Sequence, residues 1–259
     1  MRTNHVKEQL RAGKPSYGCW LSLPSVEAAR VVARLGFDWV VVDGEHCALD
    51  PNTLGRMVGA IVDIGQAAPL VRLPANSVEW YKWSLDAGAW GVIVPMVNSR
   101  EEAERAVAFA RYPPAGQRSF GGAYAAYSFG MPSMADYAAA ANDQILVIPQ
   151  IESAAALANL EAILSVPGLD AAFVGPNDLH LQIGLPPSNE GAEPAFLAAL
   201  GRVKAEAAKH RLPLAIFCSD GAAAAARVAE GFQMVSVTTD LNSLSAAARV
   251  HLQRARENT

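Results

Sequence analysis

The sequence predicts an α/β protein that folds as one closed (β/α)8 barrel. Short apolar segments recur eight times along the 259 residues and alternate with segments of helical length. Several of them, such as WVVVD, GVIVP and ILVIPQI, are apolar throughout rather than at alternate positions, which is typical of parallel strands covered on both faces. No linker rich in Pro, Gly or Ser divides the chain, so we expect residues 1–259 to form a single domain.

The predicted strands support the barrel element by element. In chain order they are Gly18–Leu21, Trp39–Asp43, Pro69–Arg72, Gly91–Val94, Leu146–Ile151, Ala171–Gly175, Leu214–Phe217 and Met234–Val237. Strict alternation of eight strands with helices favours closure into a barrel. An open doubly wound sheet is the competing fold. It normally carries a glycine-rich dinucleotide turn after its first strand, and WLSLPS lacks that pattern.

Between these strands, capping residues in the sequence predict where helices begin and end. Gly36 is placed to cap the C-terminus of an early helix. Ser99 and Glu102 form a capping box for a helix whose apolar face is Ala103, Ala106, Val107 and Ala110. We also expect a final helix from about Leu241 to Glu257. The stretch Arg111–Met134 lacks periodicity, and connections of that length are usually functional, so we expect a lid or an interface segment there.

Composition and charge exclude several classes of protein. With 51% hydrophobic and 18% charged residues the chain must bury a large core, which excludes a disordered protein. Lys and Arg number 21 against 25 Asp and Glu, a net charge of −4 without a basic stripe, so we expect no nucleic-acid partner. Apolar segments fall short of the roughly 18 residues of a membrane span. The N-terminal segment lacks the apolar region of a secretory signal and the three cysteines are scattered, so we expect a cytoplasmic protein.

The candidate site lies where the predicted strands end. Polar residues follow four of the strands, in the segments Asp43-Gly-Glu-His46, Arg72, Gln150-Ile-Glu152 and Gly175-Pro-Asn-Asp178. In parallel barrels the active site forms at the carboxyl ends of the strands. These segments therefore bring a histidine, an arginine, a glutamine and several carboxylates to one mouth.

These residues have both a chemical and a structural interpretation. Glu152 directly follows an apolar strand, where burial of a carboxylate is costly without a partner. With Asp178 it forms an oxygen-ligand pair suited to Mg²⁺ or Mn²⁺, although Asp178 alone is also placed to cap a short helix. Arg72 suits an ion pair within the fold, or a carboxylate or enolate of a substrate. His46 follows Asp43 closely enough to be oriented by it, as general bases often are.

Three other mechanisms are disfavoured. None of the strand ends carries a lysine, which disfavours a Schiff-base enzyme; the lysines are Lys7, Lys14, Lys82, Lys204 and Lys209. No pair of histidines has the spacing of zinc ligands, and no Gly-x-Ser-x-Gly elbow of a hydrolase occurs. His180, one turn into a short predicted helix, is expected at the rim or the surface.

Several blocks of the sequence resemble the HpcH/HpaI aldolase family, the class II metal-dependent pyruvate aldolases. In order along nearly the whole chain they are GFDWVVVDGEH, VRLP, DAGAWGVIVPMVNSREEAERAV, YPPAGQRSFGG, IPQIES, FVGPNDL and AIFCSDGAAAAARVAEGFQMVSVTTDL. The resemblance implies a TIM barrel and reversible aldol cleavage of a 4-hydroxy-2-oxo acid to pyruvate plus an aldehyde. Substrates of known members include 4-hydroxy-2-oxoheptanedioate, 2-dehydro-3-deoxyglucarate and 2-keto-3-deoxyrhamnonate.

The same resemblance implies a divalent metal, with Mg²⁺, Mn²⁺ and Co²⁺ as candidates. Glu152 and Asp178 would hold this metal, and pyruvate would chelate it through its carboxylate and keto oxygens. The backbone around Gly175 and Asn177, next to Asp178, would bind the pyruvate carboxylate. Gln150 would line the substrate pocket.

The catalytic roles implied by the resemblance fall on three residues. Arg72 would stabilise the enolate oxygen. His46, paired with Asp43, would act with a water as acid and base at the hydroxyl of the second fragment. The family is also hexameric, as a trimer of dimers or a dimer of trimers, which implies a homo-oligomer with the C-terminal helix exchanged between subunits.

Two positions depart from the family pattern. Asn177 stands where many members have a small residue before the aspartate, and Cys47-Ala-Leu-Asp50 replaces a segment of the Ala-Pro-Asn-Asp type. Both lie near the expected pocket. They bear on the identity of the substrate rather than on the class of reaction, and the sequence does not specify the aldehyde.

Two alternative functions stay open from the sequence. A CoA-thioester lyase of the citrate lyase β-subunit or malyl-CoA lyase type shares the barrel and the metal pair, but this chain is short and has no basic cluster for a nucleotide phosphate. A non-catalytic ligand-binding barrel is the other alternative. Such a barrel would be free to lose part of the set Asp43, His46, Arg72, Glu152 and Asp178, which is complete here.

Overall fold

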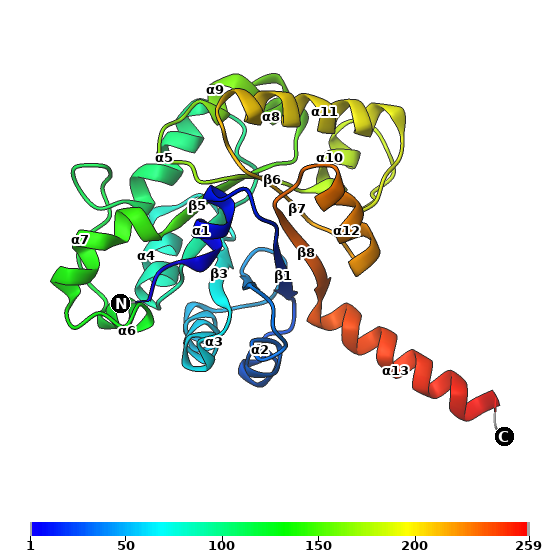
Figure 1. Cartoon of the computed structure of the whole chain (residues 1–259), viewed down its shortest axis with the longest axis horizontal. Helices are drawn as coiled ribbons and strands as arrows, with labels where there is room; N and C mark the ends of the chain where they lie inside the picture. The colour runs from blue at the N-terminus through cyan, green and yellow to red at the C-terminus, as the bar shows by residue number, and fades with distance from the viewer. Residues whose placement is uncertain (1, 258–259) are drawn as a thin grey trace.

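The computed structural model describes residues 2–257 and places eight parallel strands in a closed barrel surrounded by helices (Figure 1). The strands are β1 (Ser16–Leu21), β2 (Trp39–Asp43), β3 (Ala68–Arg72), β4 (Gly91–Val94), β5 (Leu146–Ile151), β6 (Ala172–Val174), β7 (Leu214–Ile216) and β8 (Met234–Thr239). Each pairs with the next, and β8 pairs back onto β1. The predicted barrel is confirmed, and every predicted strand boundary lies within two residues of the observed one.

The helices cover the outside of the sheet, as connections between parallel strands require. In chain order they are α1 (His5–Arg11), α2 (Val26–Val32), α3 (Pro51–Ile64), α4 (Val78–Asp86), α5 (Arg100–Ala110), α6 (Ala123–Ser128), α7 (Met134–Gln144), α8 (Ala154–Ala158), α9 (Leu160–Leu164), α10 (Pro176–Gln182), α11 (Pro194–Lys209), α12 (Gly221–Ala229) and α13 (Asp240–Glu257). Ser99 caps α5 as predicted, because its Oγ accepts a hydrogen bond from the backbone N–H of Glu102 at 3.3 Å. The carboxylate of Glu102 accepts from the backbone N–H of Asn98 at 2.6 Å rather than from that of Ser99, so the second half of the capping box is displaced by one residue.

Burial on both faces explains why the strands are apolar throughout. All five residues of β2 are buried. The ring of Trp39 in β2 packs directly over Gly18 in β1, where a Cβ atom would lie 2.0 Å from the indole. A glycine is therefore required at that position for the two strands to pair.

Helix α1 closes the amino-terminal end of the barrel. The Nζ of Lys7 donates to the carbonyl of Ile145 at 3.0 Å and lies 2.8 Å from Asp170 Oδ1. Arg111 Nη2 donates to Asp170 Oδ2 at 2.7 Å. Burial is the main reason that the pKa of Lys7 is lowered, although the Asp170 carboxylate opposes the shift. This network seals one end of the barrel and leaves the carboxyl end open.

The stretch Arg111–Met134 is partly ordered by packing. It contains helix α6 and the buried Arg118, whose Nη2 donates to Asp86 at 2.9 Å and whose guanidinium lies over the ring of Tyr112 at 4.6 Å. Three aromatic side chains of the stretch are exposed, namely Phe120, Tyr124 and Tyr127. That the stretch Arg111–Met134 acts as a lid or an interface segment stays a prediction.

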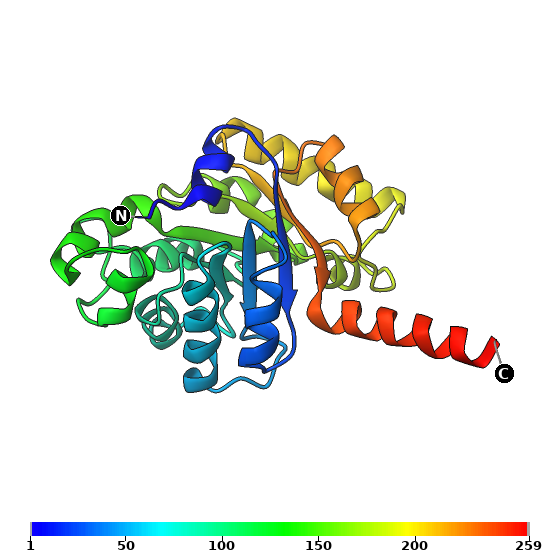
Figure 2. The ribbon, with the colours of Figure 1, turned by 60° about the horizontal axis from the view of Figure 1, so that its bottom comes forward.

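Helix α13 projects away from the barrel in both views (Figures 1 and 2). Its first residue, Asp240, is buried and accepts hydrogen bonds from the backbone N–H groups of Ser22 at 2.7 Å and Leu23 at 3.2 Å. The later residues of the helix are exposed. The predicted final helix is confirmed, whereas its exchange between subunits stays a prediction. Across residues 2–257, no helix is long and apolar enough to cross a membrane.

Candidate active site

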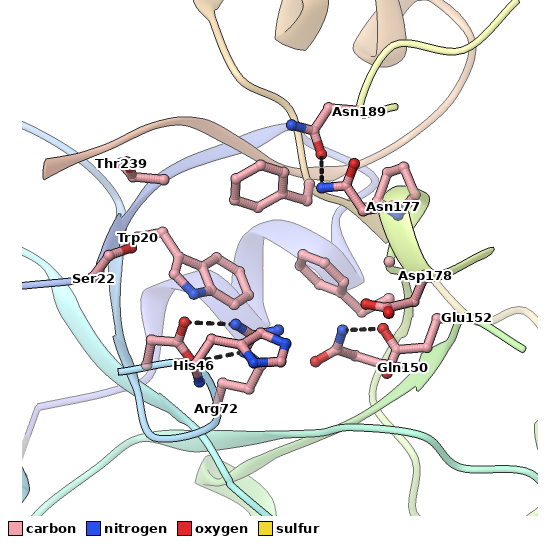
Figure 3. Close-up of a pocket in the computed structure, with 15 residues that line it drawn as sticks. Trp20, Ser22, His46, Arg72, Gln150, Glu152, Asn177, Asp178, Asn189 and Thr239 are labelled. Atoms are coloured by element: carbon pink, nitrogen blue, oxygen red, sulfur yellow. Dashed lines mark hydrogen bonds and ion pairs between the residues drawn. The ribbon is translucent and has the colours of Figure 1, made fainter. Parts of the chain in front are cut away.

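A cavity of about 290 Å³ opens at the carboxyl end of the barrel (Figure 3). It brings together all of the site residues that the sequence predicts: Asp43, His46, Arg72, Gln150, Glu152, Gly175, Asn177 and Asp178. The other residues that line it were not predicted as site residues: Trp20, Ser22, Phe173, Pro176, Asn189, Phe217 and Thr239. These side chains meet because parallel strands all end at the same rim of the barrel.

Arg72, the last residue of β3, is held by two carboxylates. Its Nε and Nη2 donate to Asp43 Oδ1 and Oδ2 at 2.8 and 2.6 Å, in a bidentate pair. Its Nη1 lies 2.8 Å from Glu45 Oε2, and its guanidinium lies over the ring of Trp20 at 5.0 Å. Such bidentate pairing fixes the plane of the guanidinium. Further N–H groups of Arg72 stay available to a ligand in the cavity.

Asp43 ends β2 and is 3% exposed. Burial alone would raise the pKa of its carboxyl group, but the hydrogen bonds and charge of Arg72 hold that pKa below its usual value. Asp43 also accepts hydrogen bonds from the backbone N–H groups of Glu45 at 3.0 Å and His46 at 3.3 Å. It therefore shapes the turn that presents His46.

The imidazole of His46 is 64% exposed, and its Nε2 lies 3.8 Å from Glu45 Oε2. The sequence predicts that Asp43 orients this histidine. The structure shows that the contact runs through the backbone of His46, and that the carboxylate nearest to the ring belongs to Glu45. Burial raises the pKa of Glu45, with Asp43 and Asp178 adding to the shift and Arg72 and His46 opposing it.

Glu152 follows β5 and is 2% exposed. Its Oε1 accepts from the backbone N–H of Met96 at 2.8 Å, and its Oε2 accepts from Gln150 Nε2 at 2.6 Å. Met96 has φ +51°, in the left-handed region that is rare for residues other than glycine. Burial raises the pKa of Glu152 to about 7, and the negative charges of Glu45 and Asp178 contribute to the shift.

Gly175 lets the chain after β6 approach Glu152. A Cβ atom at this position would lie 2.1 Å from Glu152 Oε2 and 3.2 Å from Gln150 Nε2. Helix α10 begins at the next residue and carries Asn177 and Asp178 in its first turn. No side-chain hydrogen bond caps this helix, so the cap interpretation of Asp178 is wrong. Its carboxylate instead lies beside that of Glu152 (Figure 3).

His180 is buried, and the expectation that it lies at the rim is wrong. Its ring stacks on Phe196 with centroids 3.9 Å apart. Its Nδ1 donates to the carbonyl of Pro176 at 2.6 Å, and its Nε2 lies 3.3 Å from Glu193. A helix of seven residues is too short to reveal its buried face by periodicity. Packing against α11 decides that His180 faces inward, where it holds the first turn of α10.

The oxygen atoms of this cavity suit a hard divalent cation. The carboxylates of Glu152 and Asp178 lie together, and the Oε1 of Gln150 is buried without a hydrogen-bond partner among the described residues. Carboxylate and amide oxygens are preferred ligands of Mg²⁺, which usually also keeps waters and substrate oxygens. Burial is the main reason that the pKa of Glu152 is raised, and a cation would offset the smaller contribution of the negative charges of Glu45 and Asp178. In the described part of the chain, no group of three or more His, Cys, Asp or Glu residues is arranged to hold a metal.

Two functional features escaped the sequence analysis. The first is Glu45, which lies between Asp43 and His46 in the segment Asp43-Gly-Glu-His46. Its position between two predicted site residues could have identified it. The second is Asn189, which lies in the long connection between α10 and α11 and is far along the sequence from the end of any strand. Its side chain reaches the cavity and accepts a hydrogen bond from Asn177 Nδ2 at 2.6 Å.

Comparison with known proteins gives a consistent result. The HpcH/HpaI aldolase/citrate lyase family profile matches residues 16–247. The chain is 38% identical over 253 residues to a hydroxypyruvate/pyruvate aldolase of Rhizorhabdus wittichii, with 98% of this chain and 99% of the relative covered. It is 34% identical over 248 residues to a 5-keto-4-deoxy-D-glucarate aldolase of Shigella dysenteriae, with 95% and 94% covered.

A solved structure shares the whole architecture. It is the crystal structure of an HpcH/HpaI aldolase/citrate lyase family protein from Burkholderia cenocepacia, which matches with a TM-score of 0.90 and 36% sequence identity. The match covers 98% of this chain and 100% of that chain. The similarity therefore extends over both the barrel and the strand ends that form the cavity.

Proposed function

The chain belongs to the HpcH/HpaI aldolase/citrate lyase family, and on this premise we propose that the cavity at the mouth of its barrel forms and stabilises the enolate of pyruvate. The protein is a class II pyruvate aldolase, a carbon–carbon lyase that cleaves a keto acid to pyruvate plus an aldehyde. One observation carries the assignment of the site. Buried Glu152 lies beside Asp178 in a cavity that also contains Arg72.

Cleavage of the keto acid leaves a negative charge on the pyruvate fragment, and the cavity must stabilise this charge. In cleavage, a base removes the proton of the hydroxyl group, the adjacent carbon–carbon bond breaks, and its electron pair passes to the pyruvate fragment as an enolate. Arg72 lies in the cavity with N–H groups to spare and can donate them to the enolate oxygen. Donors that are already fixed in place stabilise such charge without reorganisation.

The exposed imidazole of His46 is the group placed to move the proton. It lies at the rim of the cavity, where a water molecule can reach it. Imidazole is a common general base in enzymes, which suits it to remove the proton of the hydroxyl group. Glu45, at 3.8 Å, would stabilise the imidazolium that results. Asp43 contributes by holding both Arg72 and the backbone of His46.

Glu152 and Asp178 would hold the divalent cation on which this family of aldolases depends, with Mg²⁺, Mn²⁺ and Co²⁺ as the candidates. When bound, this cation would supply electrostatic stabilisation of the negative charge of the enolate. Gln150 adds a buried oxygen at the same side of the cavity. The backbone around Gly175 and Asn177, two residues that line the cavity, would bind the carboxylate of pyruvate.

Exchange of the methyl hydrogens of pyruvate for deuterium tests this proposal, because it needs no aldehyde. We expect purified protein to catalyse the exchange with Mn²⁺ or Mg²⁺ in D₂O, and a chelator to stop it. Glu152→Gln and Asp178→Asn should lower the rate by at least about 100-fold. Arg72→Ala should lose most of the rate while Mn²⁺ still binds, as measured by calorimetry. The exposed Glu104→Gln is the matched control.

Two outcomes would contradict the proposal. Full exchange by metal-stripped protein would exclude the cation from the mechanism. Absence of exchange with every metal, together with turnover of malyl-CoA or citramalyl-CoA, would identify a CoA-thioester lyase instead.

A further inference from the structure

A second cavity, of about 370 Å³, lies at the amino-terminal end of the barrel, between helix α1 and the segments that lead into β6 and β7. Among the described residues, it shares no lining residue with the cavity at the carboxyl end. The cations Lys7, Arg11 and Arg211 line it, together with His210. Arg11 and Arg211 are 200 positions apart in the sequence, so only the fold brings these charges together.

The carboxylate in this cavity is already paired. Of the described residues that line the cavity, Asp170 alone carries a carboxylate. Its Oδ1 lies 2.8 Å from Lys7 Nζ, and its Oδ2 accepts from Arg111 Nη2 at 2.7 Å. These contacts hold α1 against the sheet. One carboxylate shared by two cations has no negative charge left to neutralise Arg11 and Arg211.

The side chains of Arg11 and Arg211 are unpaired. Among residues 2–257, neither of them forms an ion pair or a side-chain hydrogen bond. Arg11 nevertheless acts on the interior of the cavity: burial is the main reason that the pKa of Lys7 is lowered, and the charges of Arg111 and Arg11 add to the shift. A chain with a net charge of −4 therefore carries a local excess of positive charge at this end.

The backbone of Arg211 is in a conformation that favours glycine. Its φ is +55°, and it follows the end of α11, where the backbone N–H of Leu212 donates to the carbonyl of Ala207 at 3.0 Å. A residue with a Cβ atom is sterically disfavoured there, and glycine is the usual choice after a helix. Glycine would make this turn without the steric cost, so the turn itself does not explain the arginine.

The remaining wall of the cavity is apolar. Leu10, Leu146 and Leu169 are buried, and Leu212 and Pro213 also line the cavity. Cations beside an apolar wall suit an organic anion, because its carbon chain contacts the leucines while its charged groups pair with guanidinium groups. An inorganic anion would gain nothing from the leucines.

We propose that this cavity is a second ligand site, which binds a small organic dicarboxylate through Arg11 and Arg211. A guanidinium group binds a carboxylate through two parallel N–H donors, and two unpaired guanidinium groups match two carboxylates. His210 is hydrogen-bonded to Glu206 at 3.1 Å, so the charge that attracts the ligand comes from the two arginines. The site is independent of the reaction at the carboxyl end, because the two cavities are separate.

Titration calorimetry with succinate tests this site on the metal-free protein at low ionic strength, where charge pairing is least screened. We expect a Kd below about 1 mM for succinate. Butyrate has the same number of carbons but one carboxylate, and inorganic phosphate has no carbon chain, so each should bind at least about tenfold more weakly. Absence of succinate binding, or equal affinity for succinate and either of the other two anions, would overturn the proposal.

A double variant locates the binding. Arg11→Gln combined with Arg211→Gln should weaken succinate binding by at least about tenfold and leave the exchange of pyruvate hydrogens at its wild-type rate. Arg34→Gln combined with Arg56→Gln removes the same charge from two exposed arginines outside the cavity and should change the affinity by less than about twofold. Wild-type affinity in the first double variant would place succinate elsewhere, and an equal loss in both double variants would show attraction by net charge alone. Either result would contradict the proposal.

Arg211→Gly separates ligand binding from a structural role. Because glycine favours a φ of +55°, we expect Tm to stay the same or rise, while succinate binding weakens by at least about threefold. Scanning calorimetry and titration calorimetry measure the two effects. A lower Tm with unchanged succinate binding would show that Arg211 serves the fold alone.

Discussion

One arginine organises the mouth of the barrel at the scale of single residues. Arg72 is paired to Asp43 through two hydrogen bonds and to Glu45 through a third contact, and it lies over Trp20. Because the pair with Asp43 is buried, removing one partner would leave the other charge poorly compensated. The same contacts that fix the guanidinium for its proposed role at the enolate therefore also stabilise the fold.

Asp43→Asn tests this dual role through stability. At pH 7 we expect the variant of the metal-free protein to lose about 3 kcal/mol of unfolding free energy, since Arg72 keeps only Glu45 as a partner. The pKa of Asp43 is lowered in the folded state, so its contribution is present above the unfolded-state pKa and is lost as pH falls through the folded-state pKa. The difference from wild type should therefore shrink as pH decreases from 7 to below about 4.

Urea unfolding at several pH values measures this difference. Glu104→Gln, which removes an exposed pair with Arg100, should cost less than about 1 kcal/mol and serves as the control. A difference between wild type and Asp43→Asn that stays constant from pH 7 to pH 3 would contradict the assignment.

At the scale of elements, helix α13 is the one that stands apart from the barrel in Figures 1 and 2. Leu241, Leu244 and Leu252 fall on one side of the helix by its period of 3.6 residues, and all three are exposed. An apolar hollow of about 310 Å³ at the base of the helix is lined by Val31, Leu35 and Leu244, among others. As the family resemblance implies, we propose that α13 packs against another copy of the chain.

Leu244→Lys combined with Leu252→Lys is expected to weaken this assembly, because charges on the apolar side of α13 could not be buried. Light scattering after size-exclusion chromatography should show at least a halving of the mass in solution relative to wild type. Ala246→Lys combined with Gln253→Lys adds the same charge to the other side of the helix and should leave the mass unchanged. Equal masses for wild type and for the leucine variant would contradict the proposal.

At the scale of the whole molecule, the charged residues at the two ends of the barrel have different roles. At the amino-terminal end, Asp170 joins Lys7 and Arg111, which are 6% and 5% exposed. These charges hold helix α1 against the sheet. At the carboxyl end, carboxylates outnumber the single arginine and stay open to the cavity. The charged pairs at the amino-terminal end therefore have a structural role alone, whereas those at the carboxyl end also line the proposed active site, as is usual in such barrels.

Asp170→Asn should separate these roles. The change leaves two buried cations without their carboxylate, and we expect Tm to fall by roughly 10 °C for a loss of about 3–5 kcal/mol. The exchange of pyruvate hydrogens at 25 °C should keep its wild-type rate, because Asp170 lies far from the cavity at the opposite end of the barrel. Scanning calorimetry and the exchange assay measure the two effects. A loss of exchange without a change in Tm would contradict this division.

The sequence by itself determined the barrel, its eight strands and most of the residues at its mouth. Continuous apolar segments identify strands buried on both faces, and polar residues directly after them must meet once the strands close into a barrel. That is why the sequence alone assigns Arg72, Glu152 and Asp178 to one cavity.

Only the tertiary structure decided which of these groups touch. Asp43 bonds to Arg72 rather than to the ring of His46, and Glu45 stands nearest to that ring. Asn189 reaches the cavity from a long connection between helices, and His180 is turned inward. Contacts of this kind depend on packing between segments distant in sequence, and no local period or spacing along the chain encodes them.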